Sequence, residues 1–273
     1  MRVVVDIVED YNSLDKKNLR MKERSKLFFI NILGKNIHLY TDGILAISSY
    51  LANKYYNITK GRIPLMQIPI NVNFELFKEV KPNKRNNIYK IFYGGSFGEK
   101  DGLMYLLNAF EILMEYHKNI ELILTGKPAK HGMDYILNRI NNSNVKSKIH
   151  YLWYLEDRKY YKILQNCDIF CMTMINSKYA NAGFPFKLGE MLATGKPVLA
   201  TKVGDVNNFL ENMVSAILVE PNSAEGIAKG LKFIIENPHQ AMTIGLNGKG
   251  KALEYFDSDK ISIKLRAFLN QLN

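Results

Sequence analysis

The feature that most constrains this fold is a regular alternation of apolar runs and amphipathic segments over residues 88–256. Runs such as 88–93 and 120–125, rich in Ile, Leu, Tyr and Phe and each followed by glycine, are typical of buried strands. Between them, residues 102–117 place apolar side chains at helical spacing on one face. Strands alternating with helices of this length predict an α/β fold with a parallel sheet covered by helices on both faces. Further strands are expected at 149–152, 168–174, 198–201 and 216–219, and further helices at 133–141, 157–165, 186–194, 224–236, 238–256 and 259–272.

The N-terminal part holds too few elements for a complete sheet of this kind. Residues 3–8 and 42–49 predict two strands, and Ser48 or Ser49 is expected to cap a helix that runs to about residue 56. An Asn- and Lys-rich stretch then reads as a linker. We therefore expect four parts: residues 1–78 as the remnant of an N-terminal domain, 79–87 as the linker, 88–256 as a ligand-binding domain, and 257–273 as a C-terminal helix that packs back on the N-terminal part.

Composition indicates a folded protein in a reducing compartment. Hydrophobic residues make up 47% of the 273 residues, enough for a full core, and charged residues make up 23%. The longest apolar run, around residues 27–33, is interrupted by Asn31 and is far shorter than the ~20 residues of a membrane span. The N-terminus reads as a strand rather than a secretory signal. Cys167 and Cys171 are expected to be buried reduced thiols, so we predict a cytoplasmic location.

A net charge of +11 suits an anionic partner. The basic stretch 15–26 runs into the aromatic segment 27–30, a pattern compatible with an anionic membrane surface such as the inner face of the membrane. A solvated helix face fits the same pattern, and an abundance of Lys and Asn can also reflect nucleotide bias in the gene. No nucleic-acid-binding motif is present, so nucleic acid is not an expected partner.

A motif around Lys187 gives the strongest indication of chemistry. Residues 181–201 read as a Gly-Phe-Pro loop, a short helix and an apolar strand. Lys187 and Glu190 are three residues apart, so they share one helix face at its first turn. The lysine and the positive end of the helix dipole suit a diphosphate, and the carboxylate can accept hydrogen bonds from ribose hydroxyls. The alternative is an ordinary surface ion pair, which the apolar neighbours of this pair disfavour.

The loops that follow the strands provide the other candidate contacts, because ligands bind beyond the carboxyl ends of such strands. A glycine turn at residues 94–96 offers N–H groups to an anion, although most such turns are only turns. Trp153 can flank a nucleobase, or can pack in the core or at a domain interface. The five histidines show no metal-ligand spacing, and no metal site is expected. The candidate ligand contacts are Gly94, Gly95, Ser96, Lys100, Gly126, Trp153, Gly183, Phe184, Pro185, Lys187 and Glu190.

These residues resemble the C-terminal, nucleotide-sugar-binding domain of family 4 glycosyltransferases, which have two facing Rossmann-like domains (the GT-B fold). The matching segments are 93–100 (YGGSFGEK), 121–126 (ELILTG), 166–170 (NCDIF) and, most specific, 184–198 (FPFKLGEMLATGKPV). The last is similar to the family's proline-x-lysine-x-x-glutamate variant. Residues 1–70 look like the closing part of the family's N-terminal, acceptor-side domain.

The resemblance implies a retaining hexosyltransferase that needs no metal or other cofactor. Its donor would be a UDP-sugar or GDP-sugar, with the diphosphate on Lys187, which stabilises charge, and the ribose on Glu190. Its acceptor would be a saccharide or a lipid-linked acceptor in surface polysaccharide or glycolipid biosynthesis, and the enzyme would be a cytoplasmic or peripheral membrane protein. No general base can be named from the sequence.

Three departures from the family keep other functions open. Ala182 stands where the family often has a glutamate that touches the donor sugar, and Ser96 stands where it has an arginine. Asp101 occupies the usual lysine position, with Lys100 beside it. The first strands of the N-terminal domain are expected to be missing. The alternatives are a non-catalytic or split nucleotide-sugar-binding module that needs a missing-domain partner or a dimer, and a nucleotide-sugar epimerase of similar fold.

Overall fold

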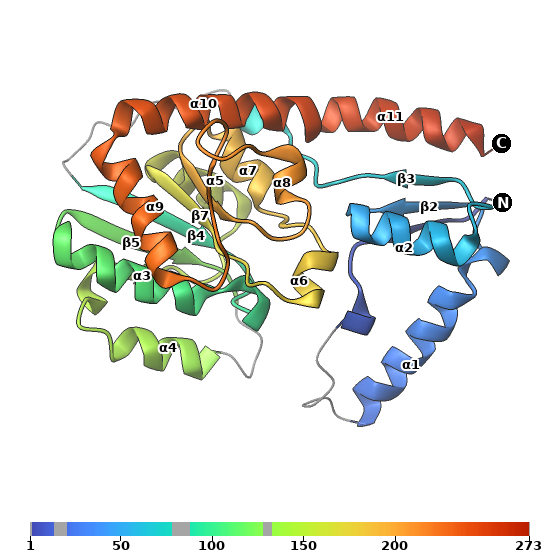
Figure 1. The fold of residues 1–273 in the computed structure, drawn as a ribbon, viewed down its shortest axis with the longest axis horizontal. Helices are drawn as coiled ribbons and strands as arrows, with labels where there is room; N and C mark the ends of the chain where they lie inside the picture. Colours follow the sequence, from blue (N-terminus) through green and yellow to red (C-terminus); the bar gives the residue numbers. More distant parts are fainter. Residues whose placement is uncertain (1, 14–20, 78–87, 128–132, 273) are drawn as a thin grey trace.

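The computed structural model describes residues 2–13, 21–77, 88–127 and 133–272, and these residues form two sheets (Figure 1). The strands are β1 (Val4–Ile7), β2 (Gly43–Ala46), β3 (Leu65–Gln67), β4 (Tyr89–Gly94), β5 (Ile120–Thr125), β6 (Ile149–Tyr151), β7 (Ile169–Met172), β8 (Val198–Thr201) and β9 (Ile217–Val219). The small sheet has the order β1-β2-β3, and the large sheet has the order β6-β5-β4-β7-β8-β9. Every described strand pair is parallel, which confirms the predicted α/β fold.

Helices cover both faces of the large sheet. The apolar side chains of β4 alternate, so that Ile91 and Tyr93 join the core on one face and Phe92 joins the core on the other. The first core receives α3 and α9, and the second receives α5 and α7. The sheet is therefore doubly wound, as predicted. The helices around it are α3 (Leu103–Tyr116), α4 (Met133–Asn141), α5 (Asp157–Asn166), α6 (Lys178–Ala182), α7 (Leu188–Ala193), α8 (Val206–Phe209), α9 (Ala224–Glu236) and α10 (Pro238–Tyr255).

The small sheet lies between α2 (Ser49–Thr59) and α11 (Ser258–Gln271) (Figure 1). Ser48 caps α2, because its hydroxyl accepts a hydrogen bond from the Leu51 amide at 3.2 Å. The helix α11 packs closely on β2, since a Cβ placed on Gly43 would lie 2.8 Å from Leu272. A further helix, α1 (Met21–Lys35), projects away from the body of the molecule. None of the described helices is long and apolar enough to cross a membrane.

The two sheets are joined where two chain segments run side by side. The Val72 amide donates to the Phe256 carbonyl at 2.7 Å, and the Ser258 amide donates to the Val72 carbonyl at 3.0 Å. The helix α10 ends at Tyr255, and α11 starts immediately after this crossing, so the C-terminal helices extend across both sheets (Figure 1).

Several local expectations need correction. A short helix, α6, occupies part of the stretch between the expected strand 168–174 and the expected helix 186–194, and Ser177 caps it by accepting from the Ala180 amide at 3.1 Å. The strand expected at 168–174 is shorter, and α8 follows β8 where no helix was expected. Of the basic segment 15–26, only residues from Met21 onward are described, and the predicted linker 79–87 lies outside the described residues. Cys167 and Cys171 are buried free thiols, as predicted.

Candidate functional site

The large sheet reverses its strand order between β4 and β7, and a cavity of about 220 Å³ opens at the carboxyl ends of these two strands. Sheets of this kind bind ligands at such a reversal. Seven of the predicted contacts line this cavity, and the residues around it are Tyr93, Gly94, Gly95, Ser96, Lys100, Asp101, Cys171, Met172, Thr173, Met174, Phe184, Pro185, Phe186 and Lys187. The fold therefore gathers distant segments of the sequence at one place.

The glycine turn is shaped by close packing against the turn that follows β5. The Gly95 amide donates to the Thr125 carbonyl at 3.1 Å, so this N–H group is already used within the protein. Gly126 has a φ of 144°, and a Cβ there would lie 1.8 Å from the Gly95 carbonyl oxygen. Glycine is thus required at position 126 because only it allows the two turns to approach.

A carboxylate occupies part of the turn that the sequence suggested as an anion cradle. Asp101 Oδ2 accepts hydrogen bonds from the Ser96 hydroxyl at 2.7 Å and from the Gly98 amide at 2.9 Å. The expectation of free N–H groups in the turn at residues 94–96 is therefore wrong for Gly95, whose amide donates to Thr125. Because Asp101 is negatively charged, an anionic ligand needs cationic side chains from elsewhere in the cavity.

Lys100 lines the same cavity but is paired across the two sheets. Its Nζ lies 3.4 Å from Glu9 Oε1, in the segment that follows β1. The same Nζ lies 4.7 Å from the centre of the Tyr179 ring, which belongs to α6. Its charge is thus shared between the candidate site and a contact with the small-sheet part of the protein.

The Lys187 segment is fixed by apolar residues that follow it. Leu188, Met191 and Leu192 are buried in the core, which holds α7 against the sheet. Gly189 allows close contact with the chain crossing, because a Cβ there would lie 2.6 Å from Val72. Since α7 has only six residues, its dipole contributes less than the sequence suggested, and the main positive charge here is that of Lys187.

Glu190 and Lys187 meet around a buried tyrosine. Lys187 Nζ lies 3.5 Å from Glu190 Oε2 and 4.1 Å from the centre of the Tyr160 ring. The Tyr160 hydroxyl donates to the same Oε2 at 2.8 Å, and the Tyr161 hydroxyl donates to Oε1 at 3.4 Å. Burial, with the Glu190 charge adding to it, raises the pKa of Tyr160 well above its usual value and that of Tyr161 to about 12. Both hydroxyls therefore remain protonated donors.

Tyr160 is a functional candidate that reasoning from the sequence missed. It is 7% exposed and packs edge-on against Phe92. A signal was available, because Tyr160 and Leu164 are four residues apart on the buried face of the predicted helix 157–165. A buried tyrosine hydroxyl needs a hydrogen-bond partner, although the sequence does not say which residue supplies it.

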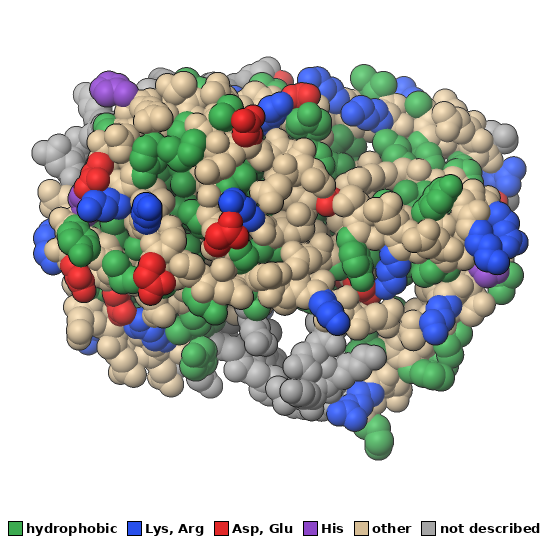
Figure 2. All heavy atoms as spheres, in the orientation of Figure 1, with side chains coloured by type: hydrophobic (Ala, Val, Ile, Leu, Met, Phe, Trp, Pro, Cys, Tyr) green, Lys and Arg blue, Asp and Glu red, His purple; other side chains and the backbone are tan. Residues whose placement is uncertain are grey.

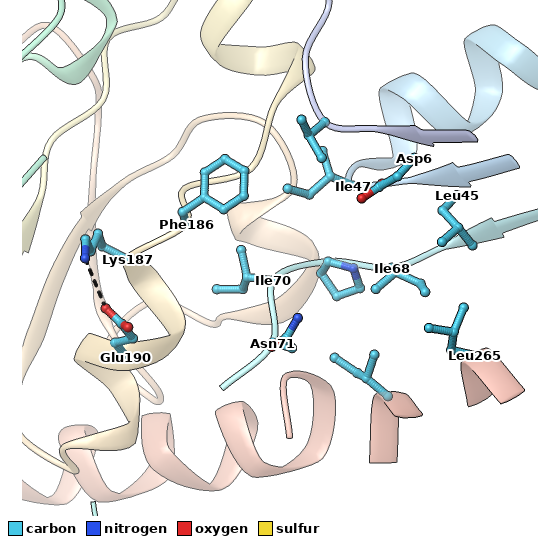
Figure 3. A pocket seen from close by; sticks show the side chains of 13 residues that line it. Asp6, Leu45, Ile47, Ile68, Ile70, Asn71, Phe186, Lys187, Glu190 and Leu265 are labelled. Carbon is cyan, nitrogen blue, oxygen red and sulfur yellow. Dashed lines mark ion pairs between the residues drawn. The ribbon is translucent and has the colours of Figure 1, made fainter. Parts of the chain in front are cut away.

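A second cavity, of about 430 Å³, shares the lining residues Phe186 and Lys187 with the first and is shown in Figure 3. Lys187, Glu190 and Phe186 bound one end, and the carboxyl ends of the small-sheet strands bound the other. Burial raises the pKa of Asp6 in this wall, and a hydrogen bond from the Ile7 backbone opposes the rise. Lys187 lines both cavities and therefore stands at their junction. The other lining residues are Val8, Leu45, Ile47, Ile68, Pro69, Ile70, Asn71, Ile261 and Leu265.

Trp153 and Gly126 are adjacent but line neither cavity. Trp153 is 48% exposed, which does not fit the core alternative for this residue, and its carbonyl accepts from the Gly126 amide at 3.0 Å. Its ring centre lies 4.9 Å from that of Tyr151. Gly183 ends α6 and also lies outside the two cavities, whereas Phe184 is buried against Phe209 and Phe256.

The position expected to touch a donor sugar is in contact with the start of α2. Ala182 is fully buried, and its carbonyl accepts a hydrogen bond from the Ser48 hydroxyl at 2.5 Å. Next to it, Asp205 is 4% exposed and accepts from the Ser49 amide at 2.6 Å and from Gln67 Nε2 at 3.0 Å. These bonds fix the small-sheet part of the protein to the loops that follow β7 and β8.

Comparison with known families agrees with the fold. The profile of the glycosyl transferases group 1 family matches residues 74–251. The chain belongs to this family. The matched range covers the whole large sheet, and it includes the glycine turn, Trp153 and the Lys187–Glu190 pair. In the described residues, no three His, Cys, Asp or Glu side chains are grouped as metal ligands.

The relatives share modest identity over most of this chain. An uncharacterized glycosyltransferase of Methanocaldococcus jannaschii, MJ1069, is 23% identical over 261 residues, which is 93% of this chain and 64% of the relative. MJ1178, a second such protein of the same organism, is 23% identical over 77% of this chain and 54% of its own length. The crystal structure of Anabaena Alr3699/HepE in complex with UDP superposes with a TM-score of 0.77 at 17% identity, over 99% of this chain and 72% of that one. This likeness confirms the GT-B fold, and the chain spans less than two thirds of both archaeal relatives.

Proposed function

We propose that this chain binds a nucleotide-diphosphate sugar and acts as a retaining, metal-independent hexosyltransferase. The observation that carries the proposal is the Lys187–Glu190 pair, with 3.5 Å between Nζ and Oε2. The pair lies where the cavity beyond the carboxyl ends of β4 and β7 meets the larger cavity of the small-sheet side. The Anabaena structure contains UDP, which supports a UDP-sugar as the first donor to test. A GDP-sugar is the alternative donor.

In this proposal the two anchor residues have separate roles. Lys187 binds the diphosphate and stabilises the charge that grows on it as the sugar leaves. Glu190 accepts hydrogen bonds from the ribose hydroxyls, held in place by Tyr160. Trp153 and the turn at Gly126 are the proposed contacts of the nucleobase. The remaining contacts come from Gly94, Gly95, Ser96, Lys100, Gly183, Phe184 and Pro185, and residues 88–256 form the donor-binding domain.

The acceptor is proposed to enter from the small-sheet side. The larger cavity has apolar side chains along its wall, with Asp6 and Asn71 among them, and it ends at Lys187 and Glu190. Such a wall suits a saccharide carried on an apolar group, which favours a lipid-linked acceptor and a role in surface polysaccharide or glycolipid assembly. The 1–78 segment contributes this acceptor side, and the segment 257–273 covers it.

Titration calorimetry with UDP, GDP and uridine tests the donor site. Lys187→Met removes one charged contact, and a hydrogen bond to a charged group contributes about 1.5–3 kcal/mol. We therefore expect UDP to bind about tenfold to a hundredfold more weakly. Uridine, which has no phosphate, should bind as it does to the unmodified protein. Lys251→Met is the matched control, because Lys251 forms the same i,i+3 ion pair, with Glu254 at 3.3 Å, on the exposed side of α10. Equal losses in both variants, or no nucleotide binding at all, would refute the assignment.

A second candidate is a module that holds the nucleotide sugar and transfers it only with a partner. This candidate is favoured by the closed packing at Ala182, whose carbonyl accepts from the Ser48 hydroxyl and which offers no carboxylate to a donor sugar. A missing-domain partner or a second copy would then complete the acceptor side. Release of labelled sugar from UDP-glucose by the chain alone would exclude this candidate, whereas nucleotide binding without any sugar release would support it.

A further inference from the structure

Lys196 is a buried cation to which the proposed donor chemistry gives no role. Over the large-sheet part of the protein, on the left in Figure 2, Lys and Arg side chains lie at the surface near Asp and Glu side chains. Lys196 differs from them because it is only 7% exposed. Lysine is almost never fully buried unless it is paired, so the groups that its ammonium contacts show what it holds.

The Lys196 ammonium caps the C-terminal end of α5. Its Nζ donates to the carbonyl oxygens of Cys167 at 2.5 Å, Gln165 at 2.6 Å and Leu164 at 3.4 Å. Three acceptors match the three N–H donors of an ammonium group. The last carbonyls of a helix have no partner within the helix, and the negative end of the helix dipole favours a cation there. Burial lowers the pKa of Lys196 and the charge of Asp168 opposes this fall, so these hydrogen bonds support a charged group in a buried place.

The backbone of Lys196 is held by the segments around it. Gly195 has a φ of 73°, the left-handed conformation that commonly ends a helix, and it turns the chain from α7 toward β8. The helix α10 packs directly on this turn, because a Cβ placed on Gly245 would lie 2.5 Å from the Lys196 carbonyl carbon. The Lys196 amide also donates to the Thr194 hydroxyl at 3.2 Å. The lysine therefore ties α5 to a fixed point just beyond α7.

Two contacts join α5 to the segment that contains α7. The Tyr160 hydroxyl donates to Glu190 Oε2 at 2.8 Å, and Lys196 binds the carbonyl of Leu164, one helical turn after Tyr160. At the opposite end of α5, the side chain of the N-cap residue Glu156 makes no capping hydrogen bond. The position of α5 along its own axis is therefore set at its C-terminal end. A shift of that end would move the Tyr160 hydroxyl relative to Glu190.

We propose that Lys196 is a positioning residue for the candidate donor site, because it fixes α5 and thereby places the Tyr160 hydroxyl on Glu190. This inference rests on the proposed function, in which Glu190 binds the ribose hydroxyls. Lys196 lines neither cavity, so it acts through α5 and not by touching a ligand. Its loss should therefore change how strongly the protein distinguishes ribose from deoxyribose, which a general loss of stability would not do.

Calorimetric titration with UDP and 2′-deoxy-UDP tests this role. Lys196→Met removes the ammonium and keeps a long unbranched side chain. We expect it to weaken UDP binding by about fivefold to tenfold, through the weakened hydrogen bond to Glu190, and to bring the ratio of the two dissociation constants toward one. When Tyr160→Phe and Tyr161→Phe are already present, Lys196→Met should change the Kd for UDP by less than about twofold, because α5 then has no hydroxyl to position.

Arg139→Met is the matched control, because it also removes a cation that ties two helices of the large-sheet part. Arg139 on α4 donates to Glu111 Oε1 on α3 at 2.8 Å, and neither residue lines a cavity. This variant should lose stability and keep the UDP to 2′-deoxy-UDP ratio of the unmodified protein. Lys196→Gln keeps two N–H donors for the carbonyls, and it replaces Lys196→Met if that variant does not fold.

Urea denaturation without nucleotide separates this inference from the proposed function. The effects of Lys196→Met and Tyr160→Phe on the folding equilibrium constant should be non-additive by about threefold or more, because both act on one hydrogen bond at Glu190. Additive effects overturn the inference, and so does a ribose ratio that the Lys196 variant leaves within twofold of the unmodified value. If the unmodified protein binds no UDP, the proposed function fails, and the urea experiment alone decides whether Lys196 positions Glu190.

Discussion

Tyr160→Phe gives the sharpest test of how the anchor pair is held. The substitution removes only the hydroxyl that donates to Glu190 Oε2 at 2.8 Å, and it keeps the ring under Lys187. A hydrogen bond to a charged group contributes about 1.5–3 kcal/mol. Glu190 would keep its 3.5 Å contact with Lys187 and the longer bond from Tyr161 at 3.4 Å. We therefore expect the free energy of unfolding to fall by about 1–2 kcal/mol, and the Kd for UDP to rise about tenfold.

Comparison of UDP with 2′-deoxy-UDP shows whether this loss of nucleotide affinity acts through the ribose. Glu190 is proposed to bind ribose hydroxyls, so Tyr160→Phe should weaken UDP more than 2′-deoxy-UDP, which lacks one of them. Tyr161→Phe is the matched control because its hydroxyl is the more distant donor, and it should change the Kd less than threefold. The measurement is calorimetric titration of each variant, with urea denaturation in parallel. If Tyr160→Phe binds UDP within twofold of the unmodified protein, Tyr160 is only a core residue and the reasoning fails.

Three further substitutions test the scaffold around the site by chemical denaturation. Gly126→Ala should lower the free energy of unfolding by about 3 kcal/mol, because its φ of 144° suits only glycine, whereas Gly250→Ala in open space on α10 should raise it by about 0.5–1 kcal/mol. Asp205→Ala should lower the free energy of unfolding by about 2–4 kcal/mol, because it leaves the Ser49 amide and the Gln67 side chain without their acceptor. The pKa of Asp10 is lowered because bonds from Lys54 and Ser13 outweigh the effect of burial. The stabilisation from Asp10 is therefore present above its unfolded pKa of about 3.9 and is lost as the pH falls through its lower folded pKa. Lys54→Met should thus lower the free energy of unfolding by about 2 kcal/mol at pH 7 and change it little at pH 2.

Much of the fold was predictable because its determinants are local. The strand 120–125 and the helix 224–236, capped by Ser223, have the bounds expected from apolar periodicity and capping. Short elements were missed because few residues specify them. The helix α6 depends on one cap at Ser177, and α8 has only four residues. Strand order could not be read from periodicity, and it is the order that places the cavity between β4 and β7.

The site was only partly predictable, because its partners come from distant segments. The spacing of Lys187 and Glu190 predicted that they share a helix face, and their atoms meet at 3.5 Å. The spacing could not show that Tyr160, 30 residues away from Glu190, would bind the same carboxylate. Nor could it show that the N–H group of Gly95 would be used by Thr125, since that bond depends on how closely two turns pack.

The alanine at position 182, where the resemblance leads one to expect a glutamate, fits the closed packing around it. Ala182 is fully buried against Ser48 at the start of α2, which leaves no room for a glutamate side chain there. Asp205 beside it cannot take over, because its two oxygens already accept from Ser49, Gln67 and Asn208. The Asp205 carboxylate is thus occupied by hydrogen bonds within the protein. If a diphosphate binds Lys187 as proposed, its sugar is therefore expected to extend into the larger cavity, whose acidic lining residues are Asp6 and Glu190.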